Sequence, residues 1–281
     1  MSGGDGLEGA MGEADVATDR AETTTDIAGG VGGEGQKRRF PPAEACPEVS
    51  GFLLVDKPKG PTSHDLVSRV RGRFKVKKVG HGGTLDPMAT GLMVLLLGKA
   101  TKLSDRVMGH DKVYEGTMRL GVETDTQDAE GEVVAERDAS GVTREALEAA
   151  MEAMRGDRMQ TPPMASARKV GGVPLYKLAR EGKVVEREAR LIHVYRFDLL
   201  EFAPPEARFR VACTKGTYVR TLAHDVGAAL GCGAHLSALR RTKVGDWDVA
   251  QAHPFEEIME AYSLKPYVLP MEGLGVWGMG G

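Results

Sequence analysis

The feature that most limits how this chain can fold is a glycine-rich loop that leads directly into a short apolar segment. Residues 80–91 read GHGGTLDPMATG, and residues 92–97 read LMVLLL. Glycine allows backbone conformations that other residues avoid, whereas Pro87 fixes its own φ angle and has no N–H to donate. An apolar run of this length is typical of a buried strand. We therefore predict a rigid loop that presents one acid, Asp86, at the edge of a cleft beside a core strand.

The rest of the pattern predicts an α+β fold with a mixed, mostly antiparallel central sheet that is flanked by helices and loops. Strands are expected at residues 52–55, 113–120 and 207–214, where apolar residues alternate with polar ones or run together. Helices are expected to begin at caps supplied by Ser63 and Thr143, and a third helix is expected over residues 218–230. These elements follow one another without a regular βαβ repeat, which favours the α+β class.

Composition is that of a globular protein without an evident membrane segment. Of the 281 residues 41% are hydrophobic, and no apolar run approaches the roughly 20 residues that span a bilayer. The N-terminus lacks a basic region followed by an apolar one, so no secretory signal is visible. Cys46, Cys213 and Cys232 have no paired or metal-site spacing, and we expect them to be reduced. These features predict a cytoplasmic protein with no membrane partner.

Charge is distributed unevenly along the chain. Residues 1–50 hold ten acids and four bases, so the other 231 residues carry a net charge of +3 although the whole chain carries −3. Residues 1–45 form an acidic, glycine-rich leader that we predict to be disordered, because it cannot bury enough apolar surface to offset its ordering entropy. Basic residues concentrate in residues 57–112 and 208–243, which indicates a site for a polyanion.

Several motifs in a fixed order give the chain a family resemblance. They are residues 57–63 (KPKGPTS), 80–91 (GHGGTLDPMATG), 112–121 (KVYEGTMRLG), 124–128 (TDTQD), 213–222 (CTKGTYVRTL) and 233–241 (GAHLSALRR). Together they closely resemble the TruB family of tRNA pseudouridine synthases, the bacterial enzymes that act on the T-loop. The resemblance covers roughly residues 51–253, and an ordered set of motifs is far more specific than any one of them.

The resemblance implies the pseudouridine synthase fold and three catalytic residues. Asp86 is implied to be the carboxylate that acts as nucleophile or base. Arg220 is its implied partner, expected to bind it in bidentate geometry and to oppose the rise of its pKa on burial. Tyr114 is implied to stack on the uracil and to take the proton from C5. From the residues alone, Asp86 could cap its own loop, Tyr114 could be a core aromatic residue, and Arg220 could lie on a helix surface.

Four further residues match substrate-binding positions of the family. His81 is implied to contact the target stem-loop, and Lys57 to lie beside the active site in a structural or phosphate-facing role. Tyr218 and Leu239 are implied to line the base pocket, although Leu239 could equally belong to the core. The family usually has threonine at the position of Gly82, and the glycine is expected to loosen the loop slightly.

The resemblance also implies how the chain is divided and what it binds. Residues 46–253 are the expected catalytic domain, with an RNA-contacting insertion around residues 155–190. Residues 254–281 are the expected C-terminal helix and tail, too short for the complete PUA domain that many relatives carry. The predicted partner is tRNA through its T-stem-loop, bound by a monomer without an obligate protein partner.

The predicted activity is isomerisation of a T-loop uridine (position 55 of tRNA) to pseudouridine after the base is flipped out. The reaction involves no redox step and no phosphate transfer, so no cofactor or metal is expected. Two alternatives stay open: an RNA chaperone that folds tRNA without catalysis, and a guide-RNA-dependent synthase like dyskerin. Asp125 and Asp128 could suggest a metal site, but the resemblance places them in a turn between strands.

Overall fold

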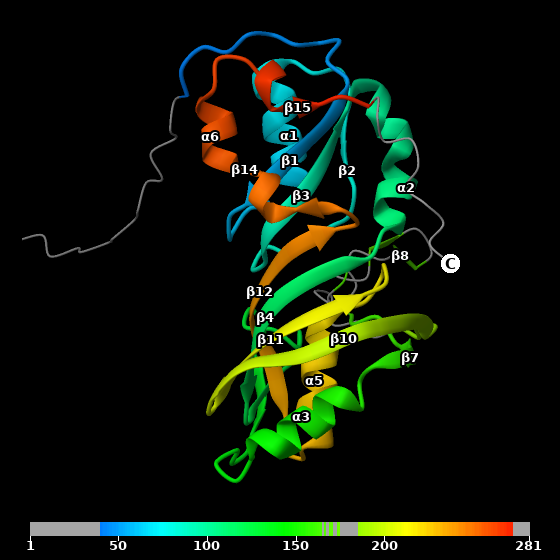
Figure 1. The fold of residues 1–281 in the computed structure, drawn as a ribbon, viewed down its shortest axis with the longest axis vertical. Helices are drawn as coiled ribbons and strands as arrows, with labels where there is room; N and C mark the ends of the chain where they lie inside the picture. Colours follow the sequence, from blue (N-terminus) through cyan, green and yellow to red (C-terminus); the bar gives the residue numbers. More distant parts are fainter. Residues whose placement is uncertain (1–39, 165, 167–168, 171–172, 175–184, 272–281) are drawn as a thin grey trace, which may run out of the picture. The chain divides into compact units, whose positions relative to one another are not determined.

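The structure is a computed structural model that describes residues 40–164, 166, 169–170, 173–174 and 185–271 (Figure 1). The predicted leader therefore lies outside the described residues as far as residue 39. The predicted insertion at residues 155–190 is described only in part, and the last ten residues of the predicted tail, 272–281, also lie outside. The account that follows concerns the described residues.

One 11-stranded sheet organises this part of the chain (Figure 1). Its main path runs β14–β1–β3–β12–β4–β11–β10–β7, while β13, β2 and β15 each pair with one strand of that path. The bounds are β1 Gly51–Lys57, β2 Val79–His81, β3 Thr90–Leu97, β4 Lys112–Leu120, β7 Gly156–Gln160, β10 Arg190–Ala203, β11 Glu206–Cys213, β12 Ala234–Val244, β13 Trp247–Asp248, β14 His253–Pro254 and β15 Val268–Leu269. Two small sheets are separate: β5 Val122–Thr124 with β6 Val133–Glu136, and β8 Lys169–Val170 with β9 Val173–Pro174.

The directions of the strand pairs confirm the predicted mixed, mostly antiparallel sheet. Only β1 with β14 and β3 with β12 pair in parallel within the large sheet. The other pairs of that sheet, including the long ladders between β4, β11 and β12, are antiparallel. Gly91 lies where β3 meets β12, with φ +100° and no room for a side chain, because a Cβ there would meet the Arg241 carbonyl oxygen at 2.3 Å.

Helices and short 3₁₀ turns cover the sheet. They are α1 Ser63–Phe74, η1 Gly98–Leu103, α2 Ser104–Gly109, α3 Arg144–Glu152, α5 Val219–Ala229, η2 Val249–Gln251, α6 Phe255–Glu260 and η3 Lys265–Tyr267. The three helices and the strands expected from the pattern are all present, within a few residues of the predicted bounds. No described helix is long and apolar enough to cross a membrane.

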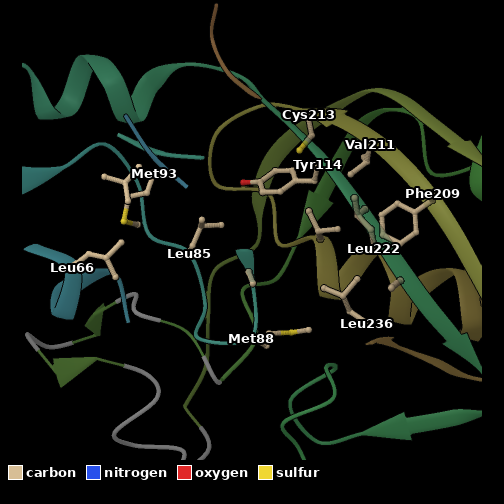
Figure 2. Close-up of a cluster of buried hydrophobic side chains, with 14 of the residues drawn as sticks. Leu66, Leu85, Met88, Met93, Tyr114, Phe209, Val211, Cys213, Leu222 and Leu236 are labelled. Atoms are coloured by element: carbon tan, nitrogen blue, oxygen red, sulfur yellow. The ribbon is translucent and has the colours of Figure 1, made fainter. Parts of the chain in front are cut away.

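The core explains why the run at residues 92–97 is apolar throughout. Met93, Leu95 and Leu97 lie in the larger buried cluster, which also takes in side chains of α1, α3 and α5. The alternate residues of the same strand lie in a second cluster with Val107 of α2 and Trp247 of β13. Strand β3 is therefore buried on both faces, whereas β11 alternates between buried and exposed residues. Figure 2 shows the larger cluster, with the Tyr114 ring within it.

The first predicted helix begins differently from the prediction. Thr62 is the N-cap of α1, and it forms a capping box in which Thr62 and Asp65 bond each other's backbone N–H. Ser63, the predicted cap, is buried, and its hydroxyl bonds the backbone of Leu85 instead. Thr143 caps α3 as predicted, by accepting a hydrogen bond from the backbone N–H of Ala146.

The two ends of the described part pack against α1 and β1, respectively. The Arg73 guanidinium donates to the Pro41 carbonyl and lies 5.3 Å from the centre of the Phe40 ring, so residues 40 and 41 contact α1. At the other end, Val268 and Leu269 form β15 on β1. Residues 253–269 thus belong to the sheet and its flanking helices, and β7 likewise makes part of the predicted insertion a sheet strand.

Candidate active site

The loop that carries Asp86 is held by buried cations. Lys57, at the end of β1, is fully buried, and its ammonium donates to the carbonyl oxygens of Pro58, Pro87 and Ala89 at 3.0, 3.2 and 2.7 Å. Burial lowers the pKa of Lys57 to about 8, although the Asp86 carboxylate acts in the opposite direction. Of the two roles implied for Lys57, these contacts fit the structural one, because its ammonium is enclosed by backbone carbonyls and holds the loop in place.

Two further contacts fix the residues just before Asp86. The Ser63 hydroxyl donates to the Leu85 carbonyl at 3.0 Å and accepts from the Leu85 N–H at 2.9 Å. Arg241 of β12 is 1% exposed, and its guanidinium donates to the carbonyls of Leu92, Thr84 and Gly83. The prediction that glycine and proline make this loop rigid therefore omits its main cause, which is side-chain bonding from α1, β1 and β12.

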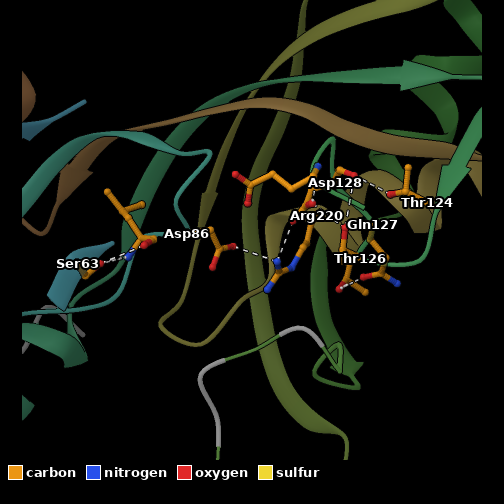
Figure 3. A network of polar contacts seen from close by, with 10 residues as sticks. Ser63, Asp86, Thr124, Thr126, Gln127, Asp128 and Arg220 are labelled. Atoms are coloured by element: carbon orange, nitrogen blue, oxygen red, sulfur yellow. Dashed lines mark hydrogen bonds and ion pairs between the residues drawn. The ribbon is translucent and has the colours of Figure 1, made fainter. Parts of the chain in front are cut away.

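Asp86 pairs with Arg220, as the resemblance implies, and a second acid shares that arginine (Figure 3). Arg220 Nη1 lies 3.2 Å from Asp86 Oδ2 and 2.9 Å from Asp128 Oδ2. One nitrogen thus bridges two carboxylates, which differs from the predicted bidentate pairing. Arg220 sits in the first turn of α5 and is 5% exposed, so it does not lie on a helix surface.

Asp128 is the acid that sequence reasoning did not assign to the site. It is 2% exposed, and its Oδ1 accepts from the Thr126 hydroxyl at 2.7 Å and from the Glu130 N–H at 3.1 Å. With Arg220 on the other oxygen, both carboxylate oxygens are bonded, as a buried charge requires. The available signal was the polar run at residues 124–128, whose spacing alone does not reveal that it faces α5 (Figure 3).

The electrostatics of Asp86 reflect its place in a cleft. Loss of solvent raises the pKa of the Asp86 carboxyl, and the Asp128 carboxylate raises it further, while Arg220 and Lys57 oppose the change. The net direction is upward, so Arg220 opposes the rise without cancelling it. The side chain is still 38% exposed, because it opens into a cavity and remains accessible to a ligand.

That cavity has a volume of about 270 Å³ and brings together five of the seven predicted site residues, namely Asp86, Tyr114, Tyr218, Arg220 and Leu239. Ligand clefts start at roughly 300 Å³, so the space suits one small group such as a base. A larger cavity of about 540 Å³ lies at residues 119–122, 136–140 and 204–205. It contains none of the predicted residues, so the smaller cavity is the better candidate.

Tyr114 lines the pocket from β4, and its ring is also part of the core (Figure 2). Burial raises the pKa of Tyr114 to about 12, although its hydroxyl interacts with the Arg241 guanidinium. The phenol is therefore neutral at physiological pH. Tyr218 lies at the N-cap of α5, with its ring centre 5.8 Å from Arg220 Cζ.

The structure places His81 and Gly82 beside the pocket, outside the residues that line it. His81 ends β2, and its Nδ1 accepts a hydrogen bond from the Gly83 N–H at 3.3 Å. Burial, with Arg241 nearby, lowers the pKa of His81. A Cβ at Gly82 would lie 2.1 Å from Val107 Cγ1, so Gly82 is closely packed and does not loosen the loop. Among the described residues, no three His, Cys, Asp or Glu side chains gather as metal ligands would.

Solved structures share this fold. A chain in the crystal structure of a Cbf5–Nop10–Gar1 complex matches with a TM-score of 0.60 at 31% identity, over 75% of this chain and 54% of that chain. A chain in the structure of an H/ACA RNP bound to a substrate RNA containing 2′-deoxyuridine matches with a TM-score of 0.57 at 27% identity, over 78% of this chain and 60% of that chain.

Sequence comparisons agree with the fold. Residues 71–219 match the TruB family pseudouridylate synthase (N terminal domain), and residues 220–274 match the tRNA pseudouridylate synthase B C-terminal domain. A tRNA pseudouridine synthase B from Opitutus terrae is 56% identical over 75% of this chain and 88% of its own length. A tRNA pseudouridine synthase B from Pseudomonas aeruginosa is 52% identical over 82% of this chain and 77% of its own length.

The fold and the site together define a pseudouridylate synthase. Within that class the chain belongs to the TruB family. The predicted family and the predicted pseudouridine synthase fold are thereby confirmed.

Proposed function

We propose that this protein isomerises a uridine in the T-loop of tRNA (position 55) to pseudouridine, with Asp86 as the catalytic carboxylate. The observation that carries the proposal is the Asp86 carboxylate facing a base-sized pocket while a buried arginine holds it. The names of relatives with about half their residues identical, each a tRNA pseudouridine synthase B, support tRNA as the substrate.

The reaction breaks the N-glycosidic bond, turns the released uracil, and joins its C5 to C1′ of the ribose. Asp86 acts in its ionised form, as a nucleophile or a base at the sugar. Arg220 keeps that form available against the loss of solvent. The walls made by Tyr114, Tyr218 and Leu239 retain the uracil while it turns. The steps are an isomerisation without net redox change, so the proposal assigns no cofactor.

Tyr114 does not act as a strong base, because its phenol is neutral. Because its pKa is about 12, only a minute fraction is phenolate at neutral pH, and the neutral hydroxyl beside Arg241 accepts the C5 proton only if it passes its own proton on. Tyr114→Phe should then retain RNA affinity and lose turnover. Loss of folding in that variant would indicate a packing role.

Reaching a stacked T-loop uridine requires flipping, which costs a few kcal/mol that backbone and stacking contacts must offset. Four exposed cations lie on or beside η1 and α2, the helix whose Met108 lines the pocket: Lys78, Lys99, Lys102 and Arg106. Within the described part of the chain, none of the four forms an ion pair, so all are available to phosphates. We assign them to the tRNA backbone.

The further parts of the proposal follow from the family. Residues 46–253 act as the catalytic domain, and the segment around residues 155–190 contacts RNA. The protein acts in the cytoplasm as a monomer without a guide RNA. The relatives at 51–56% identity named tRNA pseudouridine synthase B favour this over a guide-dependent enzyme, since the Cbf5 chain is only 31% identical.

Tritium release from a T-stem-loop RNA labelled at uridine C5 tests the proposal. The unsubstituted protein should release tritium, and Asp86→Asn should lower the rate by at least about 1000-fold while binding the RNA normally, because it loses the reacting carboxylate and keeps the pocket. Undiminished release in Asp86→Asn would contradict the proposed role. Binding and annealing of tRNA without release in either protein would indicate a chaperone.

A further inference from the structure

Gln127 has an unusual backbone conformation next to the Asp128–Arg220–Asp86 cluster. Of the described non-glycine residues, Gln127 and Lys75 have positive φ angles, +65° and +54°. Lys75 is the C-cap of α1, where a left-handed residue is expected. Gln127 ends no helix, and asparagine or glycine would adopt this conformation at lower cost. The contacts around Gln127 should therefore explain why glutamine stands at this position.

The left-handed residue turns the chain so that Asp128 faces inward. The Gln127 N–H donates to the Thr124 carbonyl at 3.1 Å, and the Gln127 carbonyl accepts from the Leu236 N–H of β12 at 3.0 Å. The next peptide continues the attachment, since the Ala129 N–H donates to the Leu236 carbonyl at 3.0 Å. The backbone on both sides of Asp128 is thus bound to the strand that forms a pocket wall.

The Gln127 side chain connects the same turn to the helix that carries the arginine. Its Oε1 accepts a hydrogen bond from the Thr221 hydroxyl at 2.7 Å. Thr221 follows Arg220 directly in α5 and is 7% exposed. Figure 3 shows Gln127 and Asp128 side by side, facing α5 near Arg220. A contact between side chains of residues 127 and 221 therefore runs beside the ion pair between residues 128 and 220.

We propose that Gln127 is a positioning residue that locks the 124–128 turn to α5, and so sets where Arg220 holds Asp86. The inference rests on the proposed function. A single Arg220 nitrogen bridges two carboxylates at 2.9 and 3.2 Å, so a small shift of Asp128 relative to α5 changes the Asp86 contact as well. Displacements near 1 Å at a reacting group can lower a rate by about 100-fold. The pocket walls come from other residues, so affinity for RNA should be unaffected.

The test separates the Gln127 side chain from its backbone. Gln127→Gly keeps the left-handed turn and removes the bond to Thr221, while Thr221→Val removes the hydroxyl with little change of shape. Each should slow single-turnover pseudouridine formation about tenfold at saturating RNA, with Kd within twofold of the parent. The double variant should be no slower than the slower single variant, because both changes remove one contact. Thr221→Ser should restore the parent rate.

Lys75→Gly is the matched control, because it changes the other left-handed residue without touching the cluster. Its rate should equal that of the parent. Rates within twofold of the parent in both Gln127→Gly and Thr221→Val, additive losses in the double variant, or a weaker Kd in place of a slower rate would each overturn the inference. A parent protein without turnover would count against the proposed function alone.

A second measurement does not depend on activity. The pKa of Asp86, followed by carbon NMR of its carboxyl, depends on the distances to Arg220 and Asp128. It should move in both Gln127→Gly and Thr221→Val and stay unchanged in Lys75→Gly. An Asp86 pKa equal to that of the parent in both variants would overturn the inference whether or not the parent turns over.

Discussion

At the residue scale, the Asp86 carboxylate combines poor solvation with the need to be charged. The pocket raises its pKa, and its two cationic neighbours counteract only part of that rise. A group in this state is reactive because the ionised form is less stabilised than it would be in water. The same condition has consequences for activity and for folding that can be measured separately.

Arg220→Lys should reduce the single-turnover rate by about 100-fold, since an ammonium on a different stem cannot bridge two carboxylates at the guanidinium's distances. It also loses the planar group that lies 5.8 Å from the Tyr218 ring. Rapid-quench measurements at saturating RNA, with melting temperature as the control for folding, would check this. A rate within twofold of the parent would refute the pairing.

Asp86→Asn should stabilise the protein at neutral pH. Because the folded-state pKa of Asp86 is raised, the folded protein binds this proton more tightly, and stability falls as pH rises from the ordinary 3.8 through the folded pKa. Above that window the ionised group opposes folding, so the variant should melt higher at pH 7, by at most roughly a few degrees. The difference should vanish below the window.

Asp138→Asn provides the contrast, because hydrogen bonds from Ser140 to the carboxylate lower the pKa of Asp138. The ionised Asp138 carboxylate therefore stabilises the folded protein. This stabilisation is present above the ordinary pKa of the group and is lost as pH falls through its folded-state pKa. Asp138→Asn should accordingly melt at a lower temperature than the parent at pH 7. Melting temperatures of both variants and the parent, measured across pH, test these two opposite shifts. An Asp86→Asn protein less stable than its parent at pH 7 would contradict the argument.

The motifs located Asp86, Arg220 and the pocket walls because each lies within a recognisable string of residues. They did not locate Asp128 or Arg241 as parts of the site. Both are buried charges whose partners lie far away in sequence: Asp128 bonds Arg220, and Arg241 bonds the carbonyls before Asp86. A single sequence contains no signal for such pairings, because charge alone predicts a solvated surface.

At the scale of elements, the loop that carries Asp86 depends on the first turn of α1. Adjacent residues there have separate tasks, since Thr62 caps the helix and Ser63 holds Leu85. The two long strands that the pattern missed, β10 and β12, share a cause. The β10–β11 and β12–β4 ladders each contain two register shifts, which interrupt the alternation that marks a strand. By contrast β3 and β11 pair in continuous register with β1 and β4 and were recognisable.

Ser63→Ala and Thr62→Ala should therefore have different effects. Thr62→Ala should cost about 1 kcal/mol of stability, the usual value for a lost N-cap, with little change in turnover. Ser63→Ala leaves the buried Leu85 carbonyl and N–H without partners, so it should slow turnover by about tenfold in addition to destabilising. Urea unfolding and single-turnover rates measure the two quantities. Equal rates in the two variants would contradict the assigned role of Ser63.

At the scale of the whole molecule, the net charge does not reveal how charge is distributed along the chain. The chain carries −3, yet the 231 residues after residue 50 carry +3, and four of their exposed cations lie on or beside η1 and α2. Polyanion affinity that arises in this way depends on counterion release and so on salt. The composition of the whole chain alone would have suggested a mildly acidic protein without a nucleic-acid partner.

T-stem-loop affinity should fall steeply with salt. Four phosphate contacts on a single strand give a slope of roughly three in a plot of log Kd against log salt concentration. Lys99→Ala combined with Lys102→Ala removes two of the four contacts and should lower that slope by about 1.4. Lys265→Ala removes an ammonium of η3 that is already paired with Glu44, so this variant should not change the slope. A flat dependence in the parent would argue against phosphate binding.

Strand β1 is the first described strand of the chain, whereas the partners on one of its edges, β14 and β15, are the last described strands to be made. It pairs with β3 on one side and with β14 and β15 on the other. Lys57, which fastens the reactive loop, is the last residue of that strand. While the ribosome is still working on residues before 268, this edge is left open to other chains. The strands that surround β1, and with them the support of the Asp86 loop, are complete only after residue 269 has been made.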